Sequence, residues 1–410
     1  MAENQTPAAP DRSAVKILLL FLLYMSQGLP YGFQTIALPV YLRTSGASLA
    51  AIGLTGALAL PWMLKALWAP LVDRWGSARI GRRKSWILPL QAMLVGTILA
   101  ASTIDPSTHM HLLLASLLVM NLVAATQDIA VDGLAVDVLG PADLGPGNAA
   151  QVVGYKAGML IAGGLLVWLS SFFGWRGLFI SMAVAAALPL PMIFLYREGA
   201  HTFFRAPLPD FRRILGKVVD FFRLPGAWSL VLFIATYKLG ESMIDAMFKP
   251  FLVDAGFSPG TIGLWMGTYG MAASIAGSLA GGLLSSRLGV FRGLAAGALL
   301  RVFPLALEWS LTLVDPTPAQ VIGVTLAEHF FGGMLTTALF AYMMSRVDRE
   351  IGATHYTILA SVEVFGKSPG AWASGILADR MGYSWLFAAG TLVSTGTLGL
   401  LATLGDKRKK

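Results

Sequence analysis

Long apolar segments recur along the whole chain and decide what it can fold into. A helix needs about 20 mostly apolar residues to cross the hydrocarbon core of a bilayer. Twelve segments meet this requirement, over residues 15–41, 48–70, 85–104, 110–139, 148–171, 175–197, 226–253, 259–286, 290–314, 318–346, 354–379 and 383–404. Because backbone groups in lipid must be hydrogen-bonded within the protein, we expect an all-α membrane protein with twelve transmembrane helices.

The composition excludes most other classes of protein. Hydrophobic residues make up 56% of the chain and charged residues only 13%, which is too apolar for an ordinary soluble domain. Cysteine is absent, so disulfides and thiolate metal sites are excluded. The sequence Gly366-Lys367-Ser368 resembles the end of a phosphate-binding loop, but the upstream glycine is missing because position 361 is Ser. We therefore expect no enzyme activity, no metal and no cofactor.

One long polar segment divides the apolar segments into two groups of six. Residues 198–225 are rich in Arg and contain Pro207, Pro209 and Pro225, which interrupt any continuous span. This pattern predicts two six-helix bundles. The expected parts are a cytoplasmic tail 1–14, an N-terminal bundle 15–197, a basic cytoplasmic linker 198–225, a C-terminal bundle 226–405 and a basic tail 406–410.

The placement of Lys and Arg predicts the orientation, because positively charged short loops stay in the cytoplasm. Alternate loops, including the basic linker, hold most of these residues, whereas the remaining loops hold only Arg43, Arg176 and Arg380. The bias has the expected sign if both termini are cytoplasmic. The net charge of +8 is then a topology signal, and we expect no nucleic-acid partner.

Three pairs of motifs at a nearly constant offset indicate an internal repeat. The pairs are Ser48–Leu54 with Ser258–Leu264, Asp73–Gly76 with Ser286–Gly289, and Gly174–Phe179 with Gly382–Phe387. They favour duplicated bundles in parallel orientation, with a substrate bound near the membrane midplane where the halves meet.

Six basic side chains lie inside apolar segments: Lys65, Lys156, Lys238, Lys249, Arg301 and Lys367. A charge at the bilayer centre costs about 2.5–3.5 kcal/mol on insertion scales, so such residues normally face a polar pathway. The set predicts a protein that moves a solute, and a negatively charged one.

Helical periodicity places other polar residues on shared faces of the spans. These faces carry Tyr24, Gln27, Tyr31 and Gln34; Asp128 and Asp132; Lys238, Glu241, Asp245 and Lys249; and Thr325, His329 and Thr336. The predicted substrate ligands are Lys156, Lys238, Lys367, Gln27, Tyr31, Gln34, Tyr237 and His329. The predicted coupling or ion-pairing groups are Asp128, Asp132, Glu241, Asp245, Glu328 and Glu363.

Most intramembrane charges are paired, because a lone charge would neutralise. We expect Lys156 to pair with Asp128 or Asp132. A second cluster is expected from Lys238, Glu241, Glu363 and Lys367. These pairs either only hold helices together or exchange a carboxylate for an anionic substrate, and both interpretations stay open.

Small residues recur at helical spacing in both halves. Gly154 with Gly158, and Gly277 with Gly281, are four residues apart. This spacing is typical of closely packed transmembrane helices.

The loop after the second span resembles the signature loop of the major facilitator superfamily. It reads Pro70-Leu-Val-Asp73-Arg74-Trp-Gly76, followed by Gly81-Arg82-Arg83-Lys84. We predict that Asp73, Arg74, Arg82 and Arg83 form a cytoplasmic latch that holds one access state. The alternative is that these arginines only anchor the topology.

Further motifs resemble one branch of that superfamily, the acetyl-CoA transporters and AmpG muropeptide permeases. They are Gln27–Gly32, Gln127–Asp132, Tyr155-Lys156, Tyr237–Glu241, Leu144–Asn148, Thr354–Thr357 and Gly366-Lys367. The resemblance covers nearly the whole chain. It implies two six-helix bundles and alternating access by rocking of one bundle against the other.

We predict a secondary transporter of an anionic organic solute, driven by protons or the membrane potential. AmpG-type permeases carry additional C-terminal hydrophobic segments, whereas this chain ends at Lys410, which favours acetyl-CoA or a related acyl-CoA or nucleotide-type anion. A muropeptide remains the alternative, since its carboxylates also suit a lysine-rich cavity. A receptor or scaffold that keeps the fold without transport is the alternative of another class.

The remaining expectations concern where the protein works. Frequent Ala and Gly and the absence of cysteine favour a bacterial inner membrane. We expect a multi-pass monomer whose partners are the lipid bilayer, a small anionic solute and protons.

Overall fold

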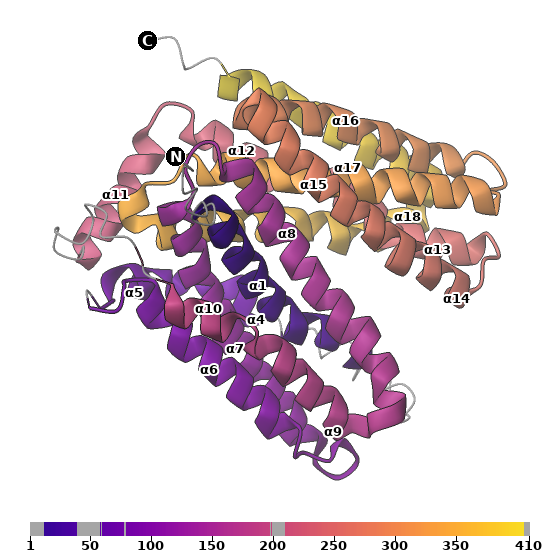
Figure 1. Ribbon diagram of the computed structural model, residues 1–410. Helices are drawn as coiled ribbons and strands as arrows, with labels where there is room; N and C mark the ends of the chain where they lie inside the picture. The colour runs from indigo at the N-terminus through magenta and orange to yellow at the C-terminus, as the bar shows by residue number, and fades with distance from the viewer. Residues whose placement is uncertain are drawn as a thin grey trace, which may run out of the picture. The chain divides into compact units, whose positions relative to one another are not determined.

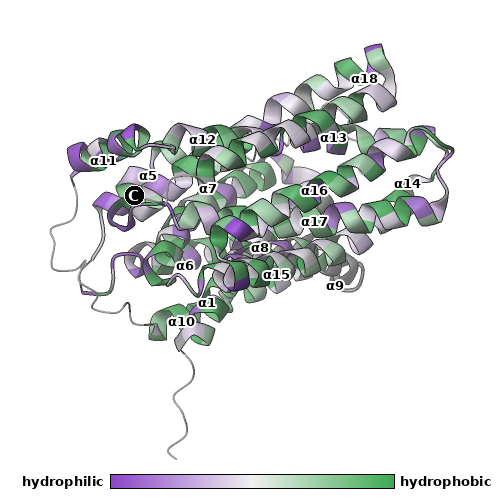
Figure 2. Cartoon of the chain, turned by 90° about the horizontal axis from the view of Figure 1, so that it is seen from above, coloured by the Kyte–Doolittle hydropathy of each residue, from purple (hydrophilic) through white to green (hydrophobic). Residues whose placement is uncertain are grey.

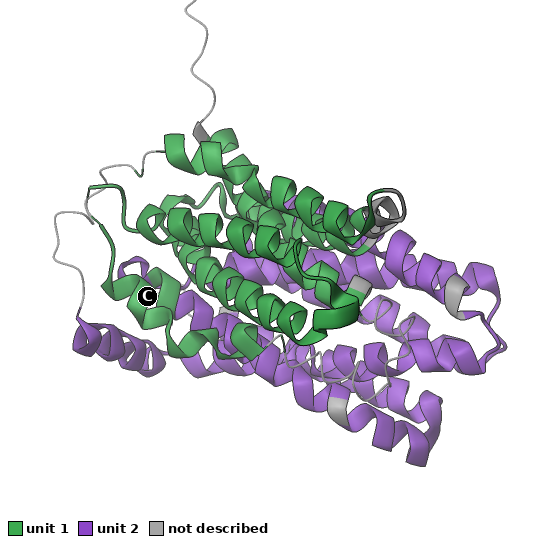
Figure 3. Ribbon diagram, turned by 90° about the horizontal axis from the view of Figure 1, so that it is seen from below, with its two compact units in different colours: residues 1–208, 352–354 green, residues 209–351, 355–410 purple. Residues whose placement is uncertain are grey.

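The computed structural model describes residues 12–38, 58, 60–77, 79–196, 198 and 210–405. These residues are mostly helical, and no strand occurs among them (Figure 1). The chain forms two compact units (Figure 3). Unit 1 holds Met1–Leu208 and the short segment Gly352–Thr354, and unit 2 holds Pro209–Ile351 and His355–Lys410. The division after Leu208 falls within the segment predicted to be the linker.

Unit 1 contains nine α-helices among the described residues. They are α1 (Arg12–Gly32), α4 (Leu60–Leu64), α5 (Ala69–Arg74), α6 (Lys84–Ala101), α7 (Pro106–Val138), α8 (Leu144–Leu160), α9 (Leu166–Ala187) and α10 (Pro189–Leu195), with the start of α18 (Gly352–Gly405). Short π-helical turns continue α1 at Phe33–Ala37 and α8 at Ile161–Leu165, and a 3₁₀ turn follows α4 at Lys65–Leu67.

Unit 2 contains the remaining α-helices of the described chain. They are α11 (Phe211–Arg223), α12 (Ala227–Thr236), α13 (Leu239–Asp254), α14 (Pro259–Ile262), α15 (Met271–Leu288), α16 (Val290–Leu311), α17 (Pro318–Met344) and the rest of α18. A π-helical stretch, Gly263–Gly270, joins α14 to α15, and a 3₁₀ turn, Arg349–Ile351, precedes α18.

Local chemistry explains where several helices begin. At α7 the Asp105 carboxylate accepts a hydrogen bond from the Ser107 N–H at 2.9 Å, and Pro106 occupies the first helical position. At α17, Thr317 and Gln320 form a reciprocal capping box before Pro318. These caps satisfy N–H groups that a helix start leaves without a partner.

Two glycines interrupt long helices at matching places in the repeat. Gly174, inside α9, has φ 67°, and Gly382, inside α18, has φ 77°. Only glycine adopts this backbone conformation readily. Each lies in a Gly-aromatic motif that the sequence analysis paired, so this pair of the repeat is visible in the backbone. The pair Ser48–Leu54 with Ser258–Leu264 cannot be compared, since 48–54 lies outside the described residues.

Close helix packing at small residues is confirmed in both units. A Cβ on Gly158 of α8 would lie 2.1 Å from the Met25 carbonyl oxygen of α1. A Cβ on Gly277 of α15 would lie 1.8 Å from the Phe330 carbonyl oxygen of α17. Gly154 and Gly281 make similar approaches, at 2.4 and 2.3 Å. The helix backbones therefore touch only because these positions lack a side chain.

The predicted count of twelve spans is met in part. Seven described helical segments are long and apolar enough to cross a membrane: Ser13–Thr35, Lys84–Ala101, Pro106–Val138, Phe173–Leu195, Val290–Leu311, Pro318–Met344 and Ala373–Leu404. An eighth would be the bent pair α11 and α12–α13, which turns through 88°.

Five predicted spans are not among these seven, namely 48–70, 148–171, 226–253, 259–286 and 354–379, and three of them differ for identifiable reasons. Much of 48–70 lies outside the described residues. The segment 226–253 breaks between α12 and α13, and 354–379 carries Glu363 and Lys367. Hydrophilic residues gather on α11, whereas α12 is mostly hydrophobic (Figure 2). Leu195 and Leu392 are 77% and 71% exposed, as expected for residues that contact lipid.

Candidate functional site

Unit 1 contains a buried ion-pair cluster, which we call the unit 1 cluster: Lys65, Asp128, Asp132, Tyr24 and Gln151. Lys65, in the 3₁₀ turn after α4, forms an ion pair with Asp128 of α7 and lies 3.9 Å from Asp132, one helical turn further on. The Tyr24 hydroxyl donates to Asp132 at 2.6 Å, and the Gln151 amide donates to the same carboxylate at 3.3 Å. One lysine thus lies near two neighbouring aspartates, and two further donors hold Asp132.

Asp128 and Asp132 are predicted from the sequence, but their lysine is not. Lys65 is one of the six predicted intramembrane cations, and Lys156 is the partner expected in its place. Lys65 and Asp128 are 63 residues apart in the chain, so no local spacing connects them. A contact of Lys156 with either aspartate stays a prediction.

Aromatic and amide side chains extend the unit 1 cluster. The Lys65 ammonium lies 5.6 Å from the ring centre of Trp62, within range of a cation–π contact. Tyr155 packs between the rings of Trp62 and Tyr31, at 6.0 and 5.8 Å between centroids. Tyr31, a predicted substrate ligand, therefore lies in an aromatic group beside the charged pair.

The two predicted amide ligands of α1 have different surroundings. Gln34 accepts a hydrogen bond from Asn121 at 2.7 Å, and Asn121 in turn accepts one from Trp62 at 2.8 Å. Gln27 is fully buried, and its side-chain amide has no hydrogen-bond partner among the described residues. The predicted role of Gln27 as a substrate ligand stays a prediction.

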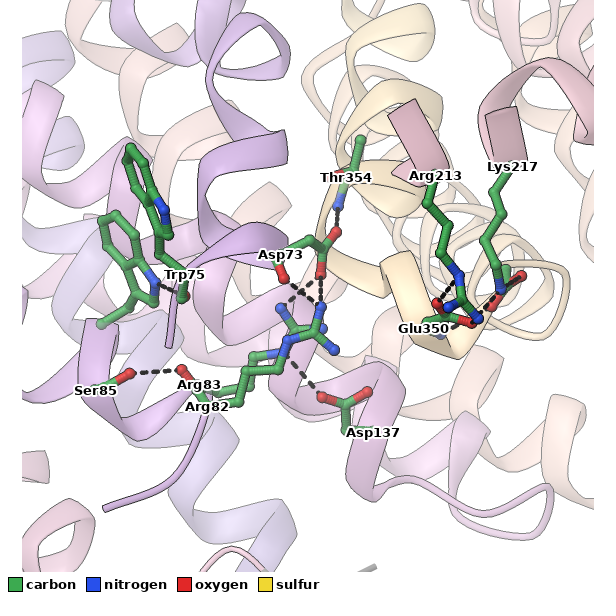
Figure 4. Close-up of polar contacts among 12 residues, drawn as sticks. Asp73, Trp75, Arg82, Arg83, Ser85, Asp137, Arg213, Lys217, Glu350 and Thr354 are labelled. Carbon is green, nitrogen blue, oxygen red and sulfur yellow. Dashed lines mark hydrogen bonds and ion pairs between the residues drawn. The ribbon is translucent and has the colours of Figure 1, made fainter. Parts of the chain in front are cut away.

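The predicted latch is a buried ion-pair network in unit 1 (Figure 4). Asp73 pairs with Arg82 at 3.0 Å and with Arg83 at 2.8 Å, and Arg83 also pairs with Asp137 at 2.8 Å. The second Asp73 oxygen accepts a hydrogen bond of 2.6 Å from the backbone N–H of Thr354, which lies at the start of α18. Burial lowers the pKa of Arg83, but the two aspartates outweigh burial and raise it, so this guanidinium stays charged.

Arg74 does not join this network. No ion pair or hydrogen bond of its side chain is recorded among the described residues, whereas Asp137, which the sequence analysis did not name, is a member. Asp73 and Asp137 are 64 positions apart and lie on different helices, so helical periodicity alone does not bring them together.

In unit 2, Glu363 of α18 lies between two lysines. Lys238, at the break between α12 and α13, is 3.3 Å from Glu363, and Lys367, one turn along α18, is 3.2 Å away. The Tyr237 hydroxyl donates to the same carboxylate at 3.2 Å. We call these four residues the lysine pair site. The structure therefore brings together Lys238, Lys367 and Glu363, as the sequence analysis expected.

Glu241 belongs to a second group, which we call the arginine cluster: Arg301, Glu241, Asp245, Glu328 and His329. The Arg301 guanidinium of α16 pairs with Glu241 at 2.9 Å and with the Glu328 carboxylate, and it also donates to the Glu328 carbonyl. His329 contacts the other Glu328 oxygen. Carboxylate oxygens of Glu241, Asp245 and Glu328 lie within 4.8 Å of one another. The sequence analysis identified each of these residues, but not Arg301 as their shared partner.

A cavity of about 440 Å³ connects the two groups within unit 2. Its lining residues are Lys238, Glu241, Ser242, Asp245, Ala246, Lys367, Ser368 and Ala371. The Lys238 and Lys367 side chains are 18% and 36% exposed, whereas Arg301 is 3% exposed. Lys238 and Lys367 are therefore accessible from the cavity, whereas Arg301 is buried and does not line it. Lys249, also on α13, does not line the cavity.

The linker helix α11 is tied to the segment that precedes α18 (Figure 4). Arg213 pairs with Glu350 at 2.7 Å, and Lys217 pairs with Asp348 at 2.7 Å and Glu350 at 2.6 Å. Burial lowers the pKa of Lys217, but hydrogen bonds and charge from both carboxylates raise it overall. From the sequence, these basic residues are interpreted only as topology signals.

Comparison with known proteins identifies the family. An anhydromuropeptide permease of Escherichia coli K12 is 31% identical over 388 residues, covering 93% of this chain and 78% of the relative. The profile of the family described as acetyl-coenzyme A transporter 1 matches residues 16–109 and 100–173. The chain belongs to the acetyl-CoA transporter and AmpG branch of the major facilitator superfamily. It is accordingly a membrane transporter, and the resemblance inferred from its motifs is confirmed.

Other relatives agree with this assignment. A protein of Rickettsia felis named putative transporter AmpG 4 is 27% identical over 402 residues, covering 96% of this chain and 97% of the relative. The human organic anion transporter MFSD10 has a similar structure, with a TM-score of 0.67 at 17% identity over 96% of this chain and all of that one. A bacterial homologue of ferroportin gives 0.69 at 14% identity, covering 96% and 99%. At these identities the two structures establish only the fold.

Proposed function

We propose that this transporter moves an anionic organic solute by alternating access, and that Lys238 and Lys367 bind the anion. The observation that carries the proposal is the lysine pair site. Two cations that line a cavity both pair with the Glu363 carboxylate, and Glu241 and Asp245 line the same cavity. An incoming carboxylate or phosphate would replace Glu363 at one lysine, and this exchange would favour the bound conformation over the empty one.

Among possible solutes, an anhydromuropeptide is the first candidate. The permease of that name matches this chain over 93% of its length, whereas the acetyl-CoA transporter profile matches only the N-terminal half. Sequence length does not separate the two candidate solutes, since the Rickettsia relative named AmpG is matched over 97% of its own length. The lysine pair site suits the carboxylates of a muropeptide.

Acetyl-CoA is the second candidate, favoured by the family profile. Its phosphates would bind the same lysines through charge-assisted hydrogen bonds. Asp128, Asp132, Glu241 and His329 are proposed to take part in coupling to protons, and the Asp73–Arg83 network is proposed to hold one access state closed. The proposed residence is a bacterial inner membrane.

The test is counterflow in proteoliposomes that contain the purified protein. Vesicles loaded with unlabelled anhydromuropeptide should take up the labelled compound, and vesicles loaded with acetyl-CoA should not. Lys238→Ala and Lys367→Ala should each raise KM by about tenfold or more, since losing a charge-assisted contact costs about 1.5–3 kcal/mol. Lys249→Ala is the matched control, because this lysine shares α13 with the cavity but does not line it, and it should behave as wild type.

Three results would change the proposal. Uptake of acetyl-CoA alone would establish the second candidate. Binding of either solute without flux would support a receptor. Unchanged KM in both lysine variants would remove the lysine pair site as the anion site.

A further inference from the structure

Glu308 is a buried carboxyl that no motif or function above explains. It lies on α16, seven residues after Arg301, and is 1% exposed. Residues seven apart share a helix face, so both side chains point to the same side of α16. The Glu308 Oε2 atom has no hydrogen-bond partner among the described residues.

The groups around Glu308 are mostly acidic. Its electrostatic neighbours are Glu241 and Asp245 from α13, Glu328 from α17 and Arg301 from its own helix. His329, also on α17, contacts Glu328. Arg301 directs its donors to Glu241 and Glu328, so Glu308 receives no hydrogen bond from it. Three buried carboxyl groups and the exposed Asp245 therefore interact with one guanidinium in unit 2.

Such an arrangement favours a bound proton over a bound metal ion. Two of the three carboxylates that come within 4.8 Å of one another are already paired with Arg301, and Glu308 is not one of the three. Leu305, Leu311 and Val321 of the core cluster line this part of α16 and α17 and are at most 3% exposed. Burial without a hydrogen-bond partner disfavours the charged form of a carboxyl group.

We propose that Glu308 is a proton-binding site of this transporter and carries the coupling proton in the conformation described here. When the cavity opens, the proton leaves the carboxyl for water. The charge left on Glu308 is then balanced by Arg301, which turns toward it from Glu241. Glu241 lines the cavity, so the change reaches the lysine pair site through a single shared guanidinium. This inference rests on the proposed transport function.

The first test separates exchange from accumulation in proteoliposomes. One pH unit is a tenfold difference in proton activity, so one proton per solute allows about tenfold accumulation of labelled anhydromuropeptide in wild type. Glu308→Gln imitates the protonated carboxyl and cannot release a proton. It should keep counterflow at the wild-type rate but lose accumulation driven by the pH gradient. Glu308→Asp should retain accumulation. Glu350→Gln, outside the cluster, is the matched control and should behave as wild type.

The second test does not depend on transport. Infrared difference spectra should show a protonated carboxyl band in wild type that is absent from Glu308→Gln and retained in Glu350→Gln. If wild type shows no counterflow, the proposed function fails. If wild type shows counterflow and Glu308→Gln still accumulates solute under a pH gradient, or the infrared band persists in that variant, the proton site is refuted.

Discussion

The charged clusters of the two units differ in their access to a cavity. In unit 1, Lys65 is 7% exposed, and one of its two aspartates, Asp132, is held by two further donors. In unit 2, Lys238 and Lys367 of the lysine pair site and Glu241 and Asp245 of the arginine cluster line one cavity. A sealed cluster stabilises a conformation, whereas a cluster that lines a cavity can bind an anion or a proton. We therefore expect the charged clusters of the two units to have different roles.

The largest expected effect comes from Arg301→Ala. It removes the partner of Glu241 and Glu328 and leaves several buried carboxyl groups without a cation. The expected cost is about 3–5 kcal/mol, because a broken buried ion pair leaves an uncompensated charge. Thermal unfolding in detergent measures it. Arg301→Lys keeps the charge and should lose less stability than Arg301→Ala. A wild-type Tm for the alanine variant would show that unit 2 does not need this cation for stability.

Lys65→Ala should have the next largest effect. It leaves Asp128 unpaired, but Tyr24 and Gln151 continue to hold Asp132. We expect a loss of about 2–4 kcal/mol, at the lower end for a broken buried pair. Adding Asp128→Asn should recover most of that loss, since it removes the stranded charge. If the double variant is no more stable than Lys65→Ala, the unpaired charge of Asp128 is not the cause of the loss.

Glycine contacts test whether both units pack their helices equally tightly. Gly158→Ala in unit 1 and Gly277→Ala in unit 2 each place a methyl group against a backbone carbonyl. Overpacking typically costs about 1–3 kcal/mol. Gly96→Ala, which meets nothing within 4 Å, is the control and should stabilise by up to about 1 kcal/mol from helix propensity. A stabilised Gly277→Ala would contradict the backbone contact in unit 2.

The smallest effect concerns the ion pairs between α11 and the segment before α18. Burial raises the pKa of Asp348, but hydrogen bonds from Lys217 and the Glu350 backbone, with the Lys217 charge, lower it overall. A lowered folded-state pKa adds stability above the ordinary value of about 3.9, and this contribution is lost as the pH falls through the folded-state pKa.

Hydrogen exchange of α11 measures this effect. Exchange should become faster as the pH falls below about 4, after correction for the intrinsic rate, and Asp348→Asn should weaken this dependence. Because the pair is partly exposed, the effect should stay below about 1 kcal/mol. Asp220→Asn removes the exposed pair with Arg223 and should leave the pH dependence unchanged. An equal effect of both variants would mean that α11 is not held by Asp348.

Much of the architecture could be read from the sequence because it follows from local periodicity. Apolar runs of about 20 residues specify membrane helices, Gly174 and Gly382 mark the repeat, and glycines four apart mark close contacts. The lysine pair site was also predictable in part, since Glu363 and Lys367 are one turn apart on the same helix. The family followed from motifs spread over the whole chain.

Only the tertiary structure decided which charges meet. Arg301 joins Glu241 across 60 residues of sequence, and Lys65 joins Asp128 across 63. Helical periodicity specifies the face on which a side chain lies, but not the rotation or height of that helix against its neighbours. Those are set by side-chain packing and by backbone contacts such as the one at Gly277. The same packing sealed Gln27 and placed Glu308 among acidic neighbours, because the position of each charge depends on several helices at once.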